Sequence, residues 1–345
     1  MRRTDVLRTS AVVTVTAAAL VLAGCSGDTD PDRARDGAEA PGSGQTVPEG
    51  PFTYTDARGK TVELDETPTT VVAQSSVAAA LWDAGYKVDG VYGELTETDG
   101  ELNYQAGNLE LDGMEVLGKT YGEFNVQNYG LMEPDLLIDF SMDDKTLWYV
   151  PVEQAKQIFK LAPSIGVSGM GITDTEDAIE TMVDLAVKLG ADPDSEQLAD
   201  DKAAYEQALE DVAEAAKGKE DLEILMVSRD PSTFYVANPE FFPEAQTLAK
   251  LGLNFVTPDG KPEFFHAKSW EEAADYADAD VIWYDARELP EMAEKAEGID
   301  TWTSLPAVRA GQVHEWRTAA PYSYRQYAEL YQDVAEWLAE SEPVD

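Results

Sequence analysis

The chain has little cysteine, histidine or positive charge. Among its 345 residues the single cysteine is Cys25, and the two histidines are His266 and His314. One cysteine excludes an intrachain disulfide, and two histidines exclude the usual three-histidine zinc site, so no resident metal is expected. The 25 Lys and Arg are outnumbered by 67 Asp and Glu, which gives a net charge of −42. Such a surface repels nucleic acid and other copies of itself, so we expect a monomer that binds no nucleic acid.

Long apolar runs are also scarce, and the one near the start is short. The stretch from Ala11 to Leu22 follows three arginines. It falls below the roughly 20 apolar residues of a membrane-spanning helix, and a charged start before a short apolar core is typical of a secretory signal. Because it ends in Leu22-Ala23-Gly24-Cys25, the segment 1–24 resembles a bacterial lipoprotein signal peptide. An ordinary signal peptide with a chance cysteine is the alternative.

The resemblance implies that Cys25 is lipidated, palmitate being one acyl chain it could carry, and becomes the first residue of the mature protein. We therefore expect a protein anchored by lipid to the extracytoplasmic face of the cell membrane. Residues 25–50 are rich in Asp, Pro, Gly, Ala and Ser and lack an apolar period, which predicts a disordered linker. The remaining chain is long enough for two domains, and 43% hydrophobic residues exclude wholesale disorder.

Strand and helix patterns alternate along residues 51–191. Apolar and polar residues alternate over Phe52–Asp56 and Thr61–Leu64 around a glycine turn, which predicts a β-hairpin. Further strands are expected at 70–73, 88–92, 115–117, 136–140 and 164–167, and helices at 75–85, 125–131, 152–161 and from a capping box at Thr173 and Glu176 to Gly190. This βα rhythm predicts an α/β lobe with a largely parallel sheet.

A long helix separates this lobe from a second one. Asp192-Pro193 is typical of a helix start, and apolar residues then recur every three or four positions until Gly218, so we expect a connecting helix over 192–218. In residues 219–345 strands are expected at 224–228, 234–237, 254–257, 281–284 and 312–316, and helices at 240–251, 269–277, 290–296 and 325–339. The predicted fold class is α/β, with two lobes joined by one helix.

Five segments in this order resemble the solute-binding proteins of ABC importers that capture ferric siderophores, haem and cobalamin. They are Asp56–Leu64 with Pro68, Asn125-Val126-Gln127 with Leu131–Ile138, Phe159–Val167, Ser269–Glu272 with Ala279–Ile282, and Trp302 with Leu305–Val308 and Gly311–Val313. The likeness extends over residues 52–340. It implies two Rossmann-like lobes, a rigid helical backbone between them, a ligand cleft between the lobes and little closure on binding. It also implies an ABC permease as partner and no catalysis.

We expect the ligand to be an iron(III)-siderophore chelate, and the protein's acidity favours a hydroxamate or mixed chelate over an anionic catecholate. Ligands bind beyond the carboxyl ends of parallel strands. Guanidinium groups suit chelate oxygens and aromatic faces suit an apolar rim, and Arg229, directly after a strand, is the first choice. The other candidate ligand-binding residues also lie near strand ends: Gln74, Tyr92, Tyr121, Trp148, Tyr149, Trp316, Arg317, Tyr322, Tyr324 and Arg325. A local ion pair of Arg229 with Asp230, or plain core packing of the aromatics, is the simpler interpretation.

Docking to the permease is the second role that the resemblance implies. Family members present one exposed carboxylate on each lobe to arginines of the permease. The usual glutamate of an Asn-x-Glu element is Gln127 here, a departure that leaves nearby Glu123 as the candidate in the first lobe. Glu240 and Glu244 are the candidates in the second lobe.

Three other functions stay open at this point. Haem or cobalamin could replace the siderophore within the same family, with Tyr324 as an axial ligand to haem iron. A lipid-anchored hydrolase would need a nucleophile after a strand and before a helix. Ser164 has the reverse order, with a helix before it and a strand after it, and neither histidine is placed to serve it. A receptor for a bare metal ion lacks the ligands.

Overall fold

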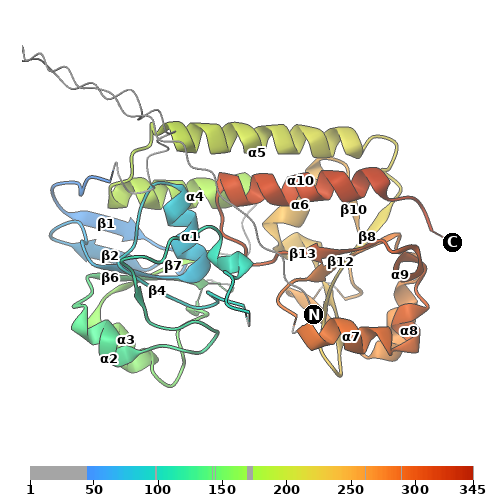
Figure 1. The fold of residues 1–345 in the computed structure, drawn as a ribbon, viewed down its shortest axis with the longest axis horizontal. Helices are drawn as coiled ribbons and strands as arrows, with labels where there is room; N and C mark the ends of the chain where they lie inside the picture. The colour runs from blue at the N-terminus through green and yellow to red at the C-terminus, as the bar shows by residue number, and fades with distance from the viewer. Residues whose placement is uncertain are drawn as a thin grey trace, which may run out of the picture. The chain divides into compact units, whose positions relative to one another are not determined.

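The computed structural model describes residues 45–97, 99–141, 143, 145–168, 174–260, 262–288 and 290–344. These residues belong to one compact unit, built around two separate main sheets (Figure 1). The predicted signal peptide, the lipidated Cys25 and nearly all of the predicted linker lie outside the described residues.

The first lobe is built on a five-stranded, wholly parallel sheet in the order β5-β4-β3-β6-β7. Its strands are β3 (Val71–Gln74), β4 (Gly90–Tyr92), β5 (Glu115–Val116), β6 (Leu136–Ser141) and β7 (Ser164–Ser168). The helices are α1 (Ser75–Asp83), η1 (Tyr104–Ala106), α2 (Val126–Leu131), α3 (Ala155–Leu161) and α4 (Thr175–Leu189). The predicted βα alternation of this lobe is confirmed.

An antiparallel hairpin of β1 (Phe52–Thr55) and β2 (Thr61–Leu64) precedes this sheet, as the alternating pattern predicted. A buried ion pair attaches its turn to β7. Arg58 lies 2.6 Å from the carboxylate of Asp56 and donates to the backbone carbonyl of Ser164, also at 2.6 Å. Oxygen Oδ1 of Asp56 accepts from the backbone N–H of Lys60. Oxygen Oδ2, which contacts Arg58, also accepts from the backbone N–H of Gly166.

The second lobe is built on a mixed sheet in the order β11-β9-β8-β12-β13, with β10 paired to β8. The strands are β8 (Glu223–Arg229), β9 (Phe234–Ala237), β10 (Asn254–Phe255), β11 (Phe265–Lys268), β12 (Val281–Asp285) and β13 (Val313–Trp316). Strands β9 and β11 run antiparallel to their neighbours, and β11 was not predicted. Its short, only partly buried edge position left no strong alternation in the sequence.

The helices of the second lobe are η2 (Pro239–Phe241), α6 (Pro243–Lys250), η3 (Trp270–Tyr276), α7 (Pro290–Glu297), α8 (Asp300–Thr303), α9 (Pro306–Ala310) and α10 (Tyr324–Glu340). Two predicted helices need correction here, and two further helices were not predicted. The helix expected at 240–251 is divided into η2 and α6 because Pro243 begins a new first turn. The segment 269–277 forms a 3-10 helix, and the short α8 and α9 were not predicted.

The connecting helix α5 (Glu196–Ala215) is 20 residues long and shorter than predicted. Its N-cap is Ser195, whose hydroxyl accepts from the N–H of Leu198, whereas the Asp192 carboxylate accepts from Asp194 in the turn before it. The start of α4 also differs from the prediction, because Asp174 is the N-cap and accepts from Asp177. Thr173, the cap expected there, lies outside the described residues.

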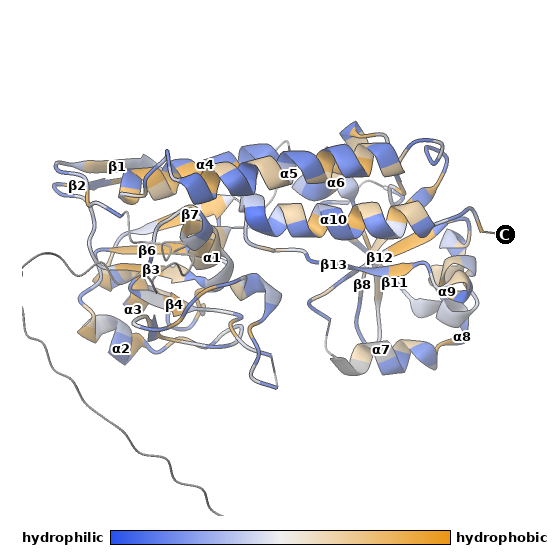
Figure 2. Ribbon diagram, turned by 45° about the horizontal axis from the view of Figure 1, so that its top comes forward, coloured by the Kyte–Doolittle hydropathy of each residue, from blue (hydrophilic) through white to orange (hydrophobic). Residues whose placement is uncertain are grey.

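The predicted single connecting helix is therefore α5, and the C-terminal helix α10 packs along it; we call α5 and α10 the helix pair (Figures 1 and 2). A buried hydroxyl cluster holds the surrounding helices together. The hydroxyl of Thr175 in α4 lies 2.9–3.0 Å from those of Tyr205 in α5, Thr247 in α6 and Tyr331 in α10. Because α4 belongs to the first lobe and α6 to the second, this cluster ties both lobes to the helix pair.

Candidate ligand-binding site

Side chains from both lobes meet near the carboxyl ends of the strands. The hydroxyl of Tyr104, in η1 of the first lobe, donates to the backbone carbonyl of Thr318, just after β13 of the second lobe, at 2.8 Å. The guanidinium of Arg287, just after β12, interacts electrostatically with the phenols of Tyr104 and Tyr149. We call the following residues the inter-lobe cluster: Tyr104, Gln105, Tyr121, Tyr149, Asp285, Arg287 and Thr318.

Arg287 is the guanidinium of this cluster, and it is held by one carboxylate. Its Nε and one terminal nitrogen donate to the two oxygens of Asp285, at 3.0 and 2.6 Å. The Arg287 side chain is 26% exposed, whereas that of Asp285 is 2% exposed. Burial lowers the pKa of Arg287, but the Asp285 carboxylate and the two phenols outweigh burial and raise it, so the guanidinium is permanently charged.

The aromatic members of the cluster come from three segments of the first lobe. The hydroxyl of Tyr149 donates to the side-chain carbonyl of the buried Gln105 at 2.6 Å, and burial raises the pKa of Tyr149. The ring of Tyr121 meets that of Tyr149 edge to face at 5.5 Å between centroids. Tyr121 is 57% exposed and Trp148, beside Tyr149 in the chain, is 39% exposed. These two aromatic faces are therefore accessible to a ligand.

Arg229 ends β8 as expected, but its partner is not Asp230. It forms a buried pair with Glu288 at 2.7 Å and lies against the rings of Tyr284 and Trp302, 4.7 and 4.5 Å from their centroids. The Asp230 carboxylate instead accepts from Ser232, Thr233 and Tyr235. Arg229 is thus already neutralised, and only 7% of it is exposed.

Trp316 and Glu244 are partners in the core of the second lobe. The indole N–H of Trp316 donates to Glu244 at 2.6 Å, and the ring packs edge to face on Phe242. Glu244 is 2% exposed, which contradicts the expectation of an exposed docking carboxylate there. Burial raises the pKa of Glu244 to about 7, although the Trp316 bond opposes this.

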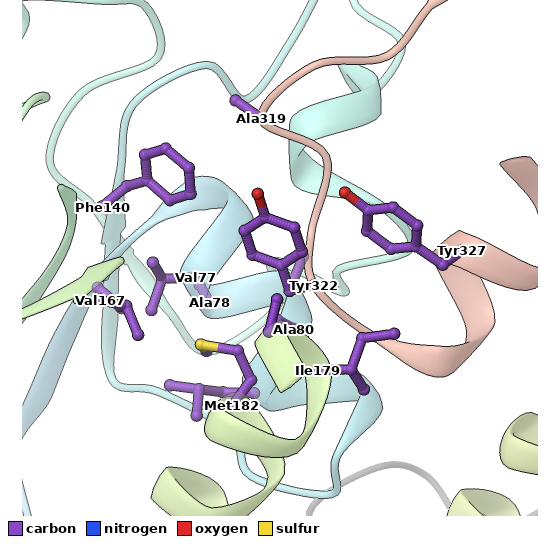
Figure 3. Close-up of a cluster of buried hydrophobic side chains, with 14 of the residues drawn as sticks. Val77, Ala78, Ala80, Phe140, Val167, Ile179, Met182, Ala319, Tyr322 and Tyr327 are labelled. Atoms are coloured by element: carbon purple, nitrogen blue, oxygen red, sulfur yellow. The ribbon is translucent and has the colours of Figure 1, made fainter. Parts of the chain in front are cut away.

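The segment from β13 to α10 brings Tyr322 against the first lobe. Its ring stacks on Phe140 at the end of β6 and on Tyr327 of α10, with centroids 6.1 and 5.5 Å apart (Figure 3). Tyr324, the first residue of α10, is buried against Tyr205 of α5. Both rings therefore pack where the lobes join the helix pair.

The remaining predicted arginines also have carboxylate partners. Arg317 pairs with Asp333 of α10 and Arg325 with Asp201 of α5, each at 3.1 Å. Their side chains are 35% and 33% exposed. These pairs direct both guanidinium groups toward the helix pair instead of toward the inter-lobe cluster.

Gln74 and Tyr92 have places in the core of the first lobe. Gln74 is fully buried, and its side-chain oxygen caps α1 by accepting from the N–H groups of Ser76 and Val77. Tyr92 is fully buried and packs edge to face on Phe124. Their positions at strand ends are explained by packing and helix capping.

The two remaining docking candidates lie at the surface. Glu123, between β5 and α2, accepts from the backbone N–H of Lys119, and both it and Glu240 in η2 are exposed. Within the described ranges no group of three or more His, Cys, Asp or Glu is arranged to hold a metal ion. None of the helices in that part of the chain is long and apolar enough to cross a bilayer.

Of the predicted set, the structure brings together Tyr121 and Tyr149, and Trp148 is the chain neighbour of Tyr149 with a partly exposed side chain. The other candidates lie elsewhere. Sequence reasoning missed Arg287, Asp285, Tyr104 and Gln105. The rule that selected Arg229 also applies to Arg287, which follows a predicted strand by three residues. Tyr104 and Gln105 lie in a long segment without a strong pattern, so only the fold reveals them.

Comparisons with known proteins agree with this architecture. Residues 71–320 match the family model described as periplasmic binding protein. The ferric-siderophore receptor DesE from Streptomyces coelicolor is 36% identical, with a TM-score of 0.76 over 86% of this chain and all of that one. FeuA from Bacillus subtilis, solved with ferri-bacillibactin, is 18% identical, with a TM-score of 0.59 over 82% of this chain and 96% of that one, and so supports the fold alone. No curated protein sequence matches.

The family match spans well over half of the chain, and the relative that is 36% identical is covered from end to end. The family and the similar structures are binding proteins and not enzymes. The chain therefore belongs to the periplasmic binding protein family, in the class of solute-binding proteins for siderophores, haem and cobalamin that its sequence resembles.

Proposed function

We propose that this protein captures a ferric siderophore outside the cell membrane and delivers it to an ABC permease. The observation that carries the proposal is the 36% identity with a ferric-siderophore receptor along that protein's whole length. The chemistry of the inter-lobe cluster agrees with such a ligand. Arg287 can donate to chelate oxygens, and the exposed ring of Tyr121 can cover an apolar rim. Trp148, next to Tyr149 in the chain and 39% exposed, is a second candidate for that rim.

The helix pair determines how the two lobes can respond to a ligand. The parts that would move are the two lobes, residues 51–191 and 219–345, and the connecting segment 192–218 lies between them. Because α5 is braced by α10 and by the hydroxyl cluster around Thr175, bending it would break buried hydrogen bonds. Closure on the ligand is therefore small, and small-angle scattering with and without ligand should give nearly the same radius of gyration.

Ligand titration tests the proposal. Residues 45–345 are titrated with iron-loaded and iron-free siderophores, haem and cobalamin while tryptophan fluorescence is followed. We expect an iron-loaded siderophore to bind best, and Tyr121→Ala or Trp148→Ala to weaken it about tenfold, since an aromatic contact contributes about 1 kcal/mol or more. Phe159→Ala is the control, because Phe159 is 43% exposed on α3, outside the cluster. Preferential binding of haem or cobalamin would contradict the proposal.

Lipid anchoring places the receptor at the membrane. The supporting observation is the sequence around Cys25, together with a family whose members are extracytoplasmic. In a bacterial host, Cys25→Ser should move the protein from the membrane fraction to the medium or the periplasm, and labelling with radioactive palmitate should be lost. Sedimentation of residues 45–345 should give a monomer, since its net charge opposes self-association.

Delivery to the permease needs a surface contact separate from the ligand site. Glu123 and Glu240 are the exposed candidates, one on each lobe. In cells that depend on this receptor, Glu123→Ala combined with Glu240→Ala should abolish iron uptake while the purified variant binds the chelate normally. Normal uptake by this double variant would exclude both residues as docking groups.

A further inference from the structure

Carboxylates outnumber cations around the inter-lobe cluster. The guanidinium of Arg287 is paired through two hydrogen bonds with Asp285, so the pair has no net charge. Glu94 interacts electrostatically with the phenol of Tyr149, and Glu244, whose buried carboxyl is partly ionised near pH 7 because its pKa is about 7, does so with both members of this pair. The field that a ligand meets beside Arg287 is therefore neutral to negative.

The arginines that could have changed this balance are neutralised too. Arg229, in the strand-end position next to β12, is matched by Glu288 from the same loop as Arg287. Arg317 and Arg325 are held by acidic residues of α10 and α5. A protein that recognises a strongly anionic chelate needs unpaired cations at its site, because a buried anion without a partner is costly.

Ferric chelates differ in charge by class. Three singly charged hydroxamates balance iron(III) and leave an uncharged core, whereas three doubly charged catecholates leave a triply negative complex. We propose that Asp285, by masking the charge of Arg287, is a specificity-determining residue that makes the site select uncharged or cationic hydroxamate-type chelates and reject polyanionic catecholates. This inference rests on the proposed function and adds the substrate class to it.

Arg287 and Asp285 have different roles in this proposal because they differ in exposure. Arg287 is the more exposed of the pair and offers the remaining N–H donors to uncharged chelate oxygens. Asp285 is buried beneath it, so it does not contact the ligand and acts only through the orientation and charge of Arg287. Loss of the carboxylate charge leaves a cation that attracts anions across the cluster.

The experiment measures the dissociation constants of residues 45–345 for a ferric trishydroxamate and a ferric triscatecholate over a range of salt concentrations. The wild-type protein should bind the trishydroxamate at least a hundredfold more tightly. Salt should leave that affinity nearly constant and should improve triscatecholate binding, because screening weakens repulsion. Asp285→Asn should reduce the preference about tenfold, and Glu288→Gln, which unmasks Arg229, should reduce it in the same direction.

Asp211→Asn is the matched control, since it removes one negative charge from an exposed position on α5 and should leave the preference unchanged. Circular dichroism shows whether Asp285→Asn folds. If it does not, the inference is tested by the binding preference of Glu288→Gln and by the salt dependence of wild-type binding. A wild-type preference for the triscatecholate, or a preference unaffected by both variants, would overturn the inference alone. Failure to bind any ferric siderophore would overturn the proposed function and this inference with it.

Discussion

The phenol of Tyr104 in the first lobe donates a hydrogen bond to the backbone carbonyl of Thr318 in the second, at 2.8 Å. Thr318 is buried, so its carbonyl has limited access to water. Tyr104 also faces Arg287, whose charge acts on its phenol. One tyrosine thus joins the two lobes and borders the proposed ligand site.

Tyr104→Phe should weaken both stability and binding. Removing the hydroxyl leaves a buried carbonyl without this partner, which costs about 1 kcal/mol in the free energy of unfolding measured with urea. Tyr235→Phe is the matched control, because its hydroxyl bonds to Asp230 within the second lobe. We expect chelate affinity to fall several-fold only in Tyr104→Phe, since the lobes are no longer held ready for the ligand. Equal affinities in the two variants would show that the bond across the lobes does not organise the site.

The hydroxyl cluster gives a second prediction. Thr175→Val keeps the shape of the side chain but leaves the hydroxyls of Tyr205, Thr247 and Tyr331 with a buried partner missing, so we expect a loss of about 1–3 kcal/mol. Thr181→Val, on the same helix, removes a hydroxyl that bonds only to the carbonyl of Asp177 and should cost far less. Urea unfolding of both variants measures the difference, and similar losses would mean that the cluster adds nothing beyond a local bond.

The order of strands and helices was predictable because local patterns determine it. Alternation defined the hairpin, and buried apolar runs defined the parallel strands of the first lobe. The ends of α5 were not predictable from proline and aspartate alone, since Ser195 competes with Asp192 as the cap. The pairing of α10 with α5 is a long-range contact, and periodicity shows only that each helix has an apolar face.

The site was harder to predict than the fold for a related reason. Topology directed the prediction to the strand ends, and of the residues chosen there the rings of Tyr121 and Tyr149 are in contact. Position along the chain did not show which arginines are matched by carboxylates, as Arg229 is by a residue 59 positions away. In a chain with so many acids, most arginines find a partner, and only the three-dimensional arrangement shows which of them a ligand can still reach.

The buried carboxyl of Glu244 should make the stability of the protein depend on pH. Burial raises its pKa to about 7, above the value near 4.5 of an exposed glutamate, so between these values the folded protein binds a proton that the unfolded chain releases. The stabilisation by the protonated form is present at low pH and is lost as the pH rises through about 7. Glu244→Gln stays neutral and keeps an oxygen for the indole of Trp316. The free energy of unfolding of Glu244→Gln, relative to that of the wild-type protein, should therefore increase by an amount on the order of 2–3 kcal/mol as the pH rises from 5 to 8. A difference that does not change with pH would contradict this origin of the shift.

The turn Asp56–Lys60 of the predicted hairpin has a second physical role in the structure, because it attaches the hairpin to the first sheet. Asp56 binds Arg58 and the backbone of Gly166, so it fixes the hairpin to β7. Asp56→Asn would leave Arg58 buried without its counter-charge, which typically costs about 3–5 kcal/mol. Asp65→Asn, on an exposed residue just after β2, should change stability by less than about 0.5 kcal/mol.

The pH dependence of the same pair separates a charge effect from a packing effect. Burial opposes ionisation of Asp56, but hydrogen bonds from Gly166 and Arg58 outweigh it and lower the pKa. The stabilisation is therefore present above the ordinary aspartate value and is lost as the pH falls through the lowered one. Urea unfolding should show a large gap between wild type and Asp56→Asn at pH 7 that narrows below about pH 4. A gap of constant size down to pH 3 would mean that Asp56 stabilises the hairpin by its shape and hydrogen bonds, with no contribution from its charge.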